Sequence, residues 1–72
     1  MAKAEFKKIS KMIADLTAVL EETIEKRTEF FDNKSEKWQE SEKGEEYSNK
    51  TDTLQEILDE LLYKYDELNE EE

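Results

Sequence analysis

The sequence predicts an all-α fold, an antiparallel two-helix hairpin that pairs with a second copy into a four-helix bundle. Apolar residues recur at helical spacing in two long segments, and a polar break separates these segments. The 72 residues include one glycine and no proline, so neither segment contains a strong helix breaker. We expect a single domain over residues 1–72, with helices over about 3–33 and about 41–69 and a turn over about 34–40.

The first helix is predicted by apolar residues that follow one another at steps of three, four and seven, which places them on one face. They are Phe6, Ile9, Ile13, Leu16, Leu20, Ile24 and Phe31. The second helix is predicted by steps that alternate between four and three, as in a coiled-coil seam. Its members are Tyr47, Thr51, Leu54, Leu58, Leu61, Tyr65 and Leu68.

The turn is predicted by the run DNKS at residues 32–35, because short polar side chains compete with helical hydrogen bonding. Ser35 can cap one further turn over 36–39, and Ser41 can serve as the N-cap of the second helix. Gly44 lies on the predicted seam, so we expect a close backbone contact there, with the first helix or with Trp38.

Helices of matched length with a short connection favour an antiparallel arrangement, and the charges agree with it. Folding back sets the basic start of the chain beside acidic residues at its end, namely Asp66, Glu67, Glu70, Glu71 and Glu72. In this register Ile9 and Ile13 meet Leu61 and Tyr65, Leu16 and Leu20 meet Leu58 and Leu54, and Phe31 meets Tyr47.

Self-association is predicted because so short a chain has a marginal core, and it has neither cysteine nor histidine to supply a disulfide or a zinc site. Several apolar side chains lie beside the stripe that the partner helix covers, and leaving them all in water would be unusual for a monomer. The predicted interface residues are Met12, Val19, Ile57 and Leu62, and Tyr63 also falls outside the seam.

The net charge of −10 favours a basic protein as a partner and opposes direct binding to nucleic acid or to a membrane. The apolar runs are too short for a signal peptide or a membrane span, which predicts a cytoplasmic protein. We expect a non-enzymatic binding protein with no cofactor and no metal. The predicted partner-binding residues are Trp38, Tyr63, Glu21, Glu22, Glu25 and Glu29. Trp38 has a second interpretation, in which it plugs the end of the bundle with Phe30, Phe31 and Tyr47.

Two alternatives remain open. In the first, oligomerisation gathers the N-terminal lysines into a sponge for a nucleotide messenger, with Lys3, Lys7, Lys8 and Lys11 as ligands. In the second, EETIE (Glu21, Glu22 and Glu25) and EILD (Glu56 and Asp59) resemble the acidic pair of motifs of all-α NTP pyrophosphatases. That resemblance implies a magnesium-dependent hydrolase.

Residues 35–61 resemble a segment of short, uncharacterised phage and prophage proteins. The match is carried by WQESEKG at residues 38–44, followed by a second acidic amphipathic helix. The resemblance implies a phage-type accessory protein that binds and disables a host protein, such as a defence or nucleic-acid-binding protein. A side-by-side dimer would carry a charge of −20, so nucleic-acid mimicry is one way in which such a protein could act.

Overall fold

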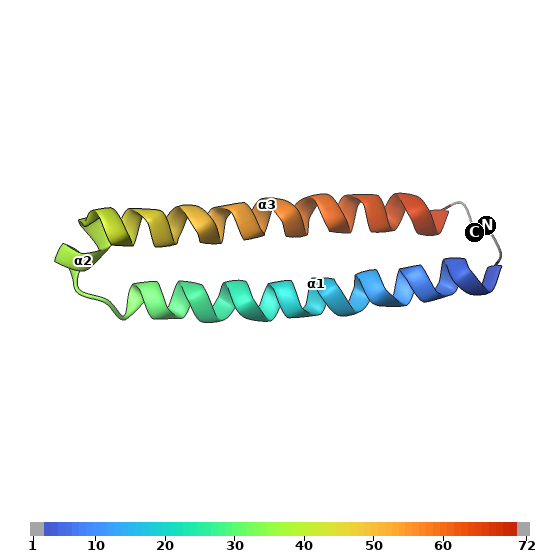
Figure 1. Ribbon diagram of the computed structural model, residues 1–72, viewed down its shortest axis with the longest axis horizontal. Helices are drawn as coiled ribbons and strands as arrows, with labels where there is room; N and C mark the ends of the chain where they lie inside the picture. Colours follow the sequence, from blue (N-terminus) through green and yellow to red (C-terminus); the bar gives the residue numbers. More distant parts are fainter. Residues whose placement is uncertain (1–2, 71–72) are drawn as a thin grey trace.

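The computed structural model describes residues 3–70, which form three helices (Figure 1). α1 spans Lys3–Asp32, α2 spans Glu36–Glu40 and α3 spans Glu42–Glu70. The described residues contain no strand, so the predicted all-α class is confirmed. Both long helices end within one residue of their predicted ends, and the short α2 occupies the predicted turn.

α1 and α3 lie side by side and run in opposite directions, so the first turns of α1 lie next to the last turns of α3 (Figure 1). The Cα atoms span 53 × 15 × 14 Å, which makes the molecule a thin rod. Two hydrogen bonds fix the register of α1 against α3. The Ser10 hydroxyl donates to Asn69 Oδ1 at 3.4 Å, and Arg27 Nε donates to Thr51 Oγ1 at 2.9 Å.

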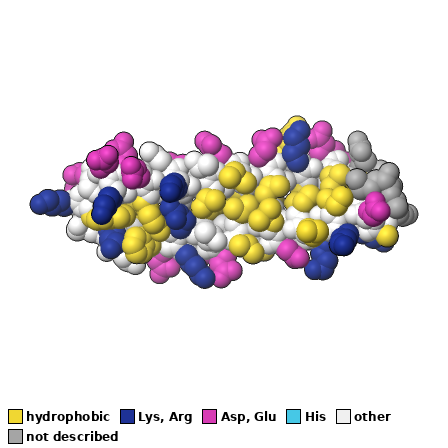
Figure 2. Space-filling view, in the orientation of Figure 1, with side chains coloured by type: hydrophobic (Ala, Val, Ile, Leu, Met, Phe, Trp, Pro, Cys, Tyr) yellow, Lys and Arg dark blue, Asp and Glu magenta, His cyan; other side chains and the backbone are white. Residues whose placement is uncertain are grey.

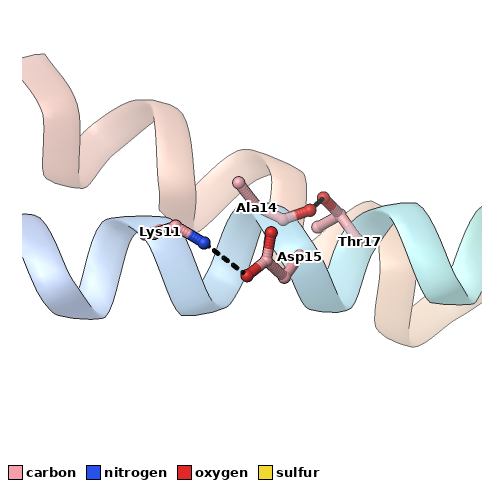
Figure 3. A network of polar contacts seen from close by, with 4 residues as sticks. All are labelled: Lys11, Ala14, Asp15 and Thr17. Atoms are coloured by element: carbon pink, nitrogen blue, oxygen red, sulfur yellow. Dashed lines mark hydrogen bonds and ion pairs between the residues drawn. The ribbon is translucent and has the colours of Figure 1, made fainter.

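The core between α1 and α3 is thin. Leu20 and Leu58 are its buried apolar residues, with 8% and 5% of their surface exposed. Thr17 shares this core, and its hydroxyl donates to the carbonyl of Ala14 at 2.8 Å, which satisfies it without a partner on α3 (Figure 3). The sequence predicts Leu16 in the seam, but the structure leaves it 48% exposed and buries Thr17 instead. Both positions fit the spacing of Ile13 and Leu20, but α1 is rotated so that the side carrying Ser10, Ile13, Thr17 and Leu20 faces α3, and Leu16 is turned by about 100° from Thr17.

The end of α1 is closed by groups from the turn. The Lys34 amide donates to the Phe31 carbonyl at 3.1 Å. The Gln39 side chain then folds back, and its Nε2 donates to the carbonyls of Phe31 at 2.8 Å and Lys34 at 3.2 Å. These bonds reach the Phe31 carbonyl, which the last turn of α1 leaves without a helical partner, and the Lys34 carbonyl in the turn. Gln39 therefore ties α2 to the end of α1.

Serine residues cap the two helices that follow α1. The Ser35 hydroxyl accepts from the Trp38 amide at 3.2 Å, which confirms the predicted cap of α2. Ser41 joins α2 to α3, because its amide and hydroxyl both donate to the Trp38 carbonyl while the hydroxyl accepts from the Gly44 amide at 3.2 Å. The predicted N-cap role of Ser41 is therefore confirmed.

Gly44 is buried in the first turn of α3, where α2 approaches it closely. A Cβ atom at this position would collide with the Trp38 carbonyl oxygen and would lie 2.7 Å from the Gln39 carbonyl oxygen. Gly44 does not adopt a positive φ, so space and not backbone conformation requires glycine here. Of the two contacts that the sequence predicts for Gly44, the structure shows the one with Trp38.

The ion pairs of the described residues lie within single helices. They join Lys11 to Asp15 at 3.2 Å, Lys26 to Glu22 at 3.1 Å and Lys64 to Glu67 at 3.5 Å. Among the described residues, no ion pair joins the basic start of α1 to the acidic end of α3, so the expected charge pairing is not observed there. The side chain of Lys3 and the residues Glu71 and Glu72 lie outside the described part.

Candidate functional site

Four aromatic rings from three helices meet where the chain turns, and we call them the turn cluster: Phe30, Phe31, Trp38 and Tyr47. Trp38 lies at the centre, with ring centroids 6.0 Å from Phe30, 6.0 Å from Phe31 and 5.9 Å from Tyr47. All three contacts of Trp38 have steep interplanar angles, the edge-to-face geometry that aromatic pairs prefer. The sequence predicts that Phe31 meets Tyr47, but the ring that packs on Tyr47 is Phe30, at 5.1 Å.

Two cations rest on the turn cluster. The guanidinium carbon of Arg27 lies 4.0 Å from the centroid of Tyr47, and Lys34 Nζ lies 4.6 Å from that of Phe30. Arg27 also donates to the Tyr47 carbonyl at 3.1 Å and to Thr51. These bonds and the cation–π contact hold Arg27 across the seam. Its role was missed by sequence reasoning, because no pattern distinguishes this arginine from a surface charge.

A shallow hollow of about 670 Å³ opens beside the turn cluster. Trp38 and Tyr47 supply its aromatic part, and the remaining lining residues are Arg27, Lys43, Glu46, Asn49 and Lys50. Trp38 is half-buried, so it belongs to the turn cluster and also presents an edge to this hollow. Its role in binding a partner stays a prediction.

One face of the rod exposes large apolar side chains from both long helices. On α1 they recur at steps of three and four, and the exposed members include Met12 at 61% and Val19 at 58%. Ile9 and Ile13 share a groove with Leu61 and Leu68 of α3, which places the two stripes on the same side of the seam. Figure 2 shows hydrophobic side chains gathered along the rod between margins that carry both acidic and basic side chains. We call this surface the apolar face, and its members are Ile9, Met12, Leu16, Val19, Ile57, Leu61 and Leu68.

The structure divides the predicted interface residues between different sides. Met12, Val19 and Ile57 belong to the apolar face. Leu62 lies five residues after Ile57, a rotation of about 140°, and therefore flanks the seam on its other side. Tyr63 is 66% exposed and is turned by about 240° from Ile57, so it points away from α1 and from the apolar face.

The predicted acidic residues of α1 form a strip on the outside of the rod. Glu21, Glu22, Glu25 and Glu29 are all exposed, and Glu22 pairs with Lys26. Nine residues separate Leu16 from Glu25, a rotation of about 180°, so the centre of the strip lies opposite the apolar face. We call these four residues the acidic strip.

The residues of the two alternatives are exposed as well, apart from Lys3, whose side chain lies outside the described part. Lys7, Lys8 and Lys11 lie on the first turns of α1, and Lys11 is engaged with Asp15 (Figure 3). Among residues 3–70, no three or more carboxylates are grouped so that they could hold a metal ion. This applies to the five positions of the pyrophosphatase-like pattern, including Glu56 and Asp59. No helix in the same range is long and apolar enough to cross a bilayer.

Comparison with protein-family models finds no matching family, and searches of curated proteins and of solved structures find no match. The resemblance of residues 35–61 to phage and prophage proteins stays a prediction from the sequence.

Proposed function

We propose that this protein is a helical hairpin that acts by stoichiometric binding of a basic protein through the acidic strip. The observation that carries the proposal is the position of Glu21, Glu22, Glu25 and Glu29, which are exposed together on the side of α1 opposite the apolar face. A helix holds such carboxylates at fixed spacing, about 1.5 Å along the axis per residue. A partner can therefore recognise the pattern of charges as well as their sum.

Long-range attraction supports the same proposal. The chain carries −10, and a surface of one sign raises the rate at which an oppositely charged protein is encountered. A rod 53 Å long has the length of a DNA segment with about 31 phosphate charges. Two copies side by side carry −20, about two-thirds of that charge, so mimicry of nucleic acid is a mode of binding open to the dimer and not to one copy.

The resemblance of residues 35–61 supports the biological setting. In this setting the protein is phage-encoded, works in the cytoplasm of the host cell, and inhibits a host defence or nucleic-acid-binding protein. Inhibition by occupancy requires an exposed surface and a tight complex, and it requires no chemistry from the chain itself.

The test compares two variants of equal charge. The first replaces the acidic strip with glutamine at all four positions, and the second replaces four exposed acidic residues elsewhere, namely Glu36, Glu40, Glu45 and Glu70. Proteins retained from host lysate by the immobilised wild-type chain are identified, purified and titrated by calorimetry in a series of salt concentrations.

We expect a fixed stoichiometry with the wild type and an affinity that falls with salt. The strip variant should bind at least about tenfold more weakly, and the control variant should lose less than about threefold. Equal losses in both variants, or binding that ignores salt, would contradict the proposal. A melting temperature raised by nucleotides, and no longer raised after Lys7, Lys8 and Lys11 are changed to glutamine, would support the nucleotide sponge instead.

A further inference from the structure

We propose that the apolar face is the surface on which two copies of this chain pair, with α1 of each copy packed against α3 of the other. The inference extends the proposed function but does not depend on the acidic strip, which lies on the opposite side of α1. It also changes the interface expected from the sequence, because Leu62 is excluded and Ile9, Leu16, Leu61 and Leu68 are included.

A single copy exposes more surface than its mass requires. One chain exposes 5903 Å², whereas a compact monomer of 8.6 kDa exposes about 4700 Å². The excess is about 1200 Å². A standard interface buries about 800 Å² on each partner. Pairing through one face of a rod 53 Å long and 15 Å wide would remove an area of that size from water.

The exposed apolar groups are concentrated on this side of the rod. The α1 stripe continues past Val19 to Phe30, which is 45% exposed and lies eleven residues further along, again on the same side of the helix. The apolar groups therefore occupy the half of the rod that holds the chain ends and recur at Phe30 beside the turn, with Thr23 and Lys26 between them on the same side of α1. A second copy supplies such a surface, and two-fold pairing requires the same patch on both partners.

Charge selects the orientation of the second copy. One possible two-fold axis runs perpendicular to the rods, in the plane between the two copies. If it is centred on the groove of Ile9, Ile13, Leu61 and Leu68, α3 packs against α3 of the second copy, and the two Lys64 side chains approach each other. The other possible axis runs parallel to the rods. It packs α1 against α3 of the second copy, and each residue keeps its position along the length of the rod. Ser10 meets Asn69 and Arg27 meets Thr51 within one chain, so Asp15 lies at the level of Lys64.

In the arrangement along the rods, each Lys64 faces the region of Asp15 in the partner, and the two charges have opposite sign. Asp15 is already held by Lys11 (Figure 3), and Lys64 by Glu67, so both side chains are placed at the margins of the apolar face. Glu56 and Glu60 line the α3 edge of this surface, and the same arrangement separates each from its own copy but brings them to the level of Glu22 of the second copy, which is paired with Lys26. The contact of Lys64 with Asp15 is therefore the charge pair that favours packing α1 against α3 of the second copy.

The experiment measures molar mass by light scattering after size exclusion, between about 1 and 200 µM, with circular dichroism as a control for folding. The wild type should elute with twice the mass of 8.6 kDa at the upper concentrations. Met12→Glu and Ile57→Glu should raise the dimer dissociation constant at least about a hundredfold and keep the helical signal, because both side chains are substantially exposed in the single chain. Tyr63→Glu is the matched control, equally exposed but on the outside, and it should leave the dissociation constant within about threefold of wild type.

A charge exchange tests the orientation. Lys64→Glu should weaken the dimer about tenfold, and adding Asp15→Lys should restore most of the loss. A monomeric wild type, or dissociation by Tyr63→Glu as strongly as by Met12→Glu, would overturn the inference. A dimer strengthened by Lys64→Glu would overturn the orientation. Binding of a basic protein by a monomeric wild type would leave the proposed function intact, so the two proposals fail separately.

Discussion

Replacing Gly44 with alanine tests the junction of α2 and α3. On helix propensity alone, alanine should stabilise α3 by about 1 kcal/mol. The structure predicts the opposite sign, because the added Cβ would lie 2.7 Å from the Gln39 carbonyl oxygen and closer still to that of Trp38. Both neighbours are backbone atoms, so no side-chain rotation can relieve the contact.

The magnitude follows from what must move. Non-bonded heavy atoms pack at about 3.5 Å or more, so α2 would have to shift by roughly 0.8 Å or more. The Trp38 carbonyl accepts two hydrogen bonds from Ser41, and this shift would weaken them. Overpacking of this kind costs about 1–3 kcal/mol. After the gain in propensity of about 1 kcal/mol is subtracted, we expect a net loss of about 0–2 kcal/mol, or up to about 16 °C in melting temperature.

The assay is thermal and urea unfolding followed by circular dichroism, with wild type and variant compared at several equal protein concentrations so that any dimer equilibrium is accounted for. Asn49→Ala is the control, because Asn49 is exposed on the same helix and alanine there should add a few tenths of a kcal/mol. The loss should persist in a Trp38→Ala background, since the collision is with the backbone. A Gly44→Ala protein more stable than wild type would refute the close approach of α2 to α3.

The seam and the turn give three further predictions, all measured by urea unfolding. Leu58→Ala should cost about 2–4 kcal/mol, because Leu58 is the most buried apolar side chain of the thin core, whereas Leu62→Ala should cost less than about 1 kcal/mol. Arg27→Met should cost about 1–3 kcal/mol by leaving the Tyr47 carbonyl without this donor and removing the cation–π contact, and equal stability would mean that the arginine is replaceable. Gln39→Ala should cost about 1 kcal/mol by removing its hydrogen bonds to the carbonyls of Phe31 and Lys34, and Gln39→Glu should not restore it, because a carboxylate cannot donate to them.

The helices and their serine caps could be predicted from the sequence because both depend on local information. Apolar spacing determines which side of a helix is buried, and a serine before a helical run has few other roles. The same logic located Gly44 on the seam. It could not choose between the two contacts proposed for Gly44, because that choice depends on how α2 is oriented.

The remaining details depend on rotations between helices that no single stripe reveals. Leu16 and Thr17 are adjacent, and the small angle by which α1 is turned towards α3 decides that Thr17 is buried. Leu62 was assigned with Ile57 because both flank the predicted stripe, and only the packed pair shows that they flank it on different sides. Arg27 and Gln39 bond to backbone carbonyls across the turn, contacts that leave no periodic signal.

The thin core also determines how stability should respond to temperature. Among the described residues, no side chain is fully removed from water, so unfolding a single copy exposes less new apolar surface than unfolding a globular domain of equal length. Its heat-capacity increment should therefore fall below the usual 12–15 cal/mol/K per residue, roughly, and its stability curve should be broad and shallow. One copy alone would then lose little stability on cooling, and on heating it would unfold over a wide range of temperature.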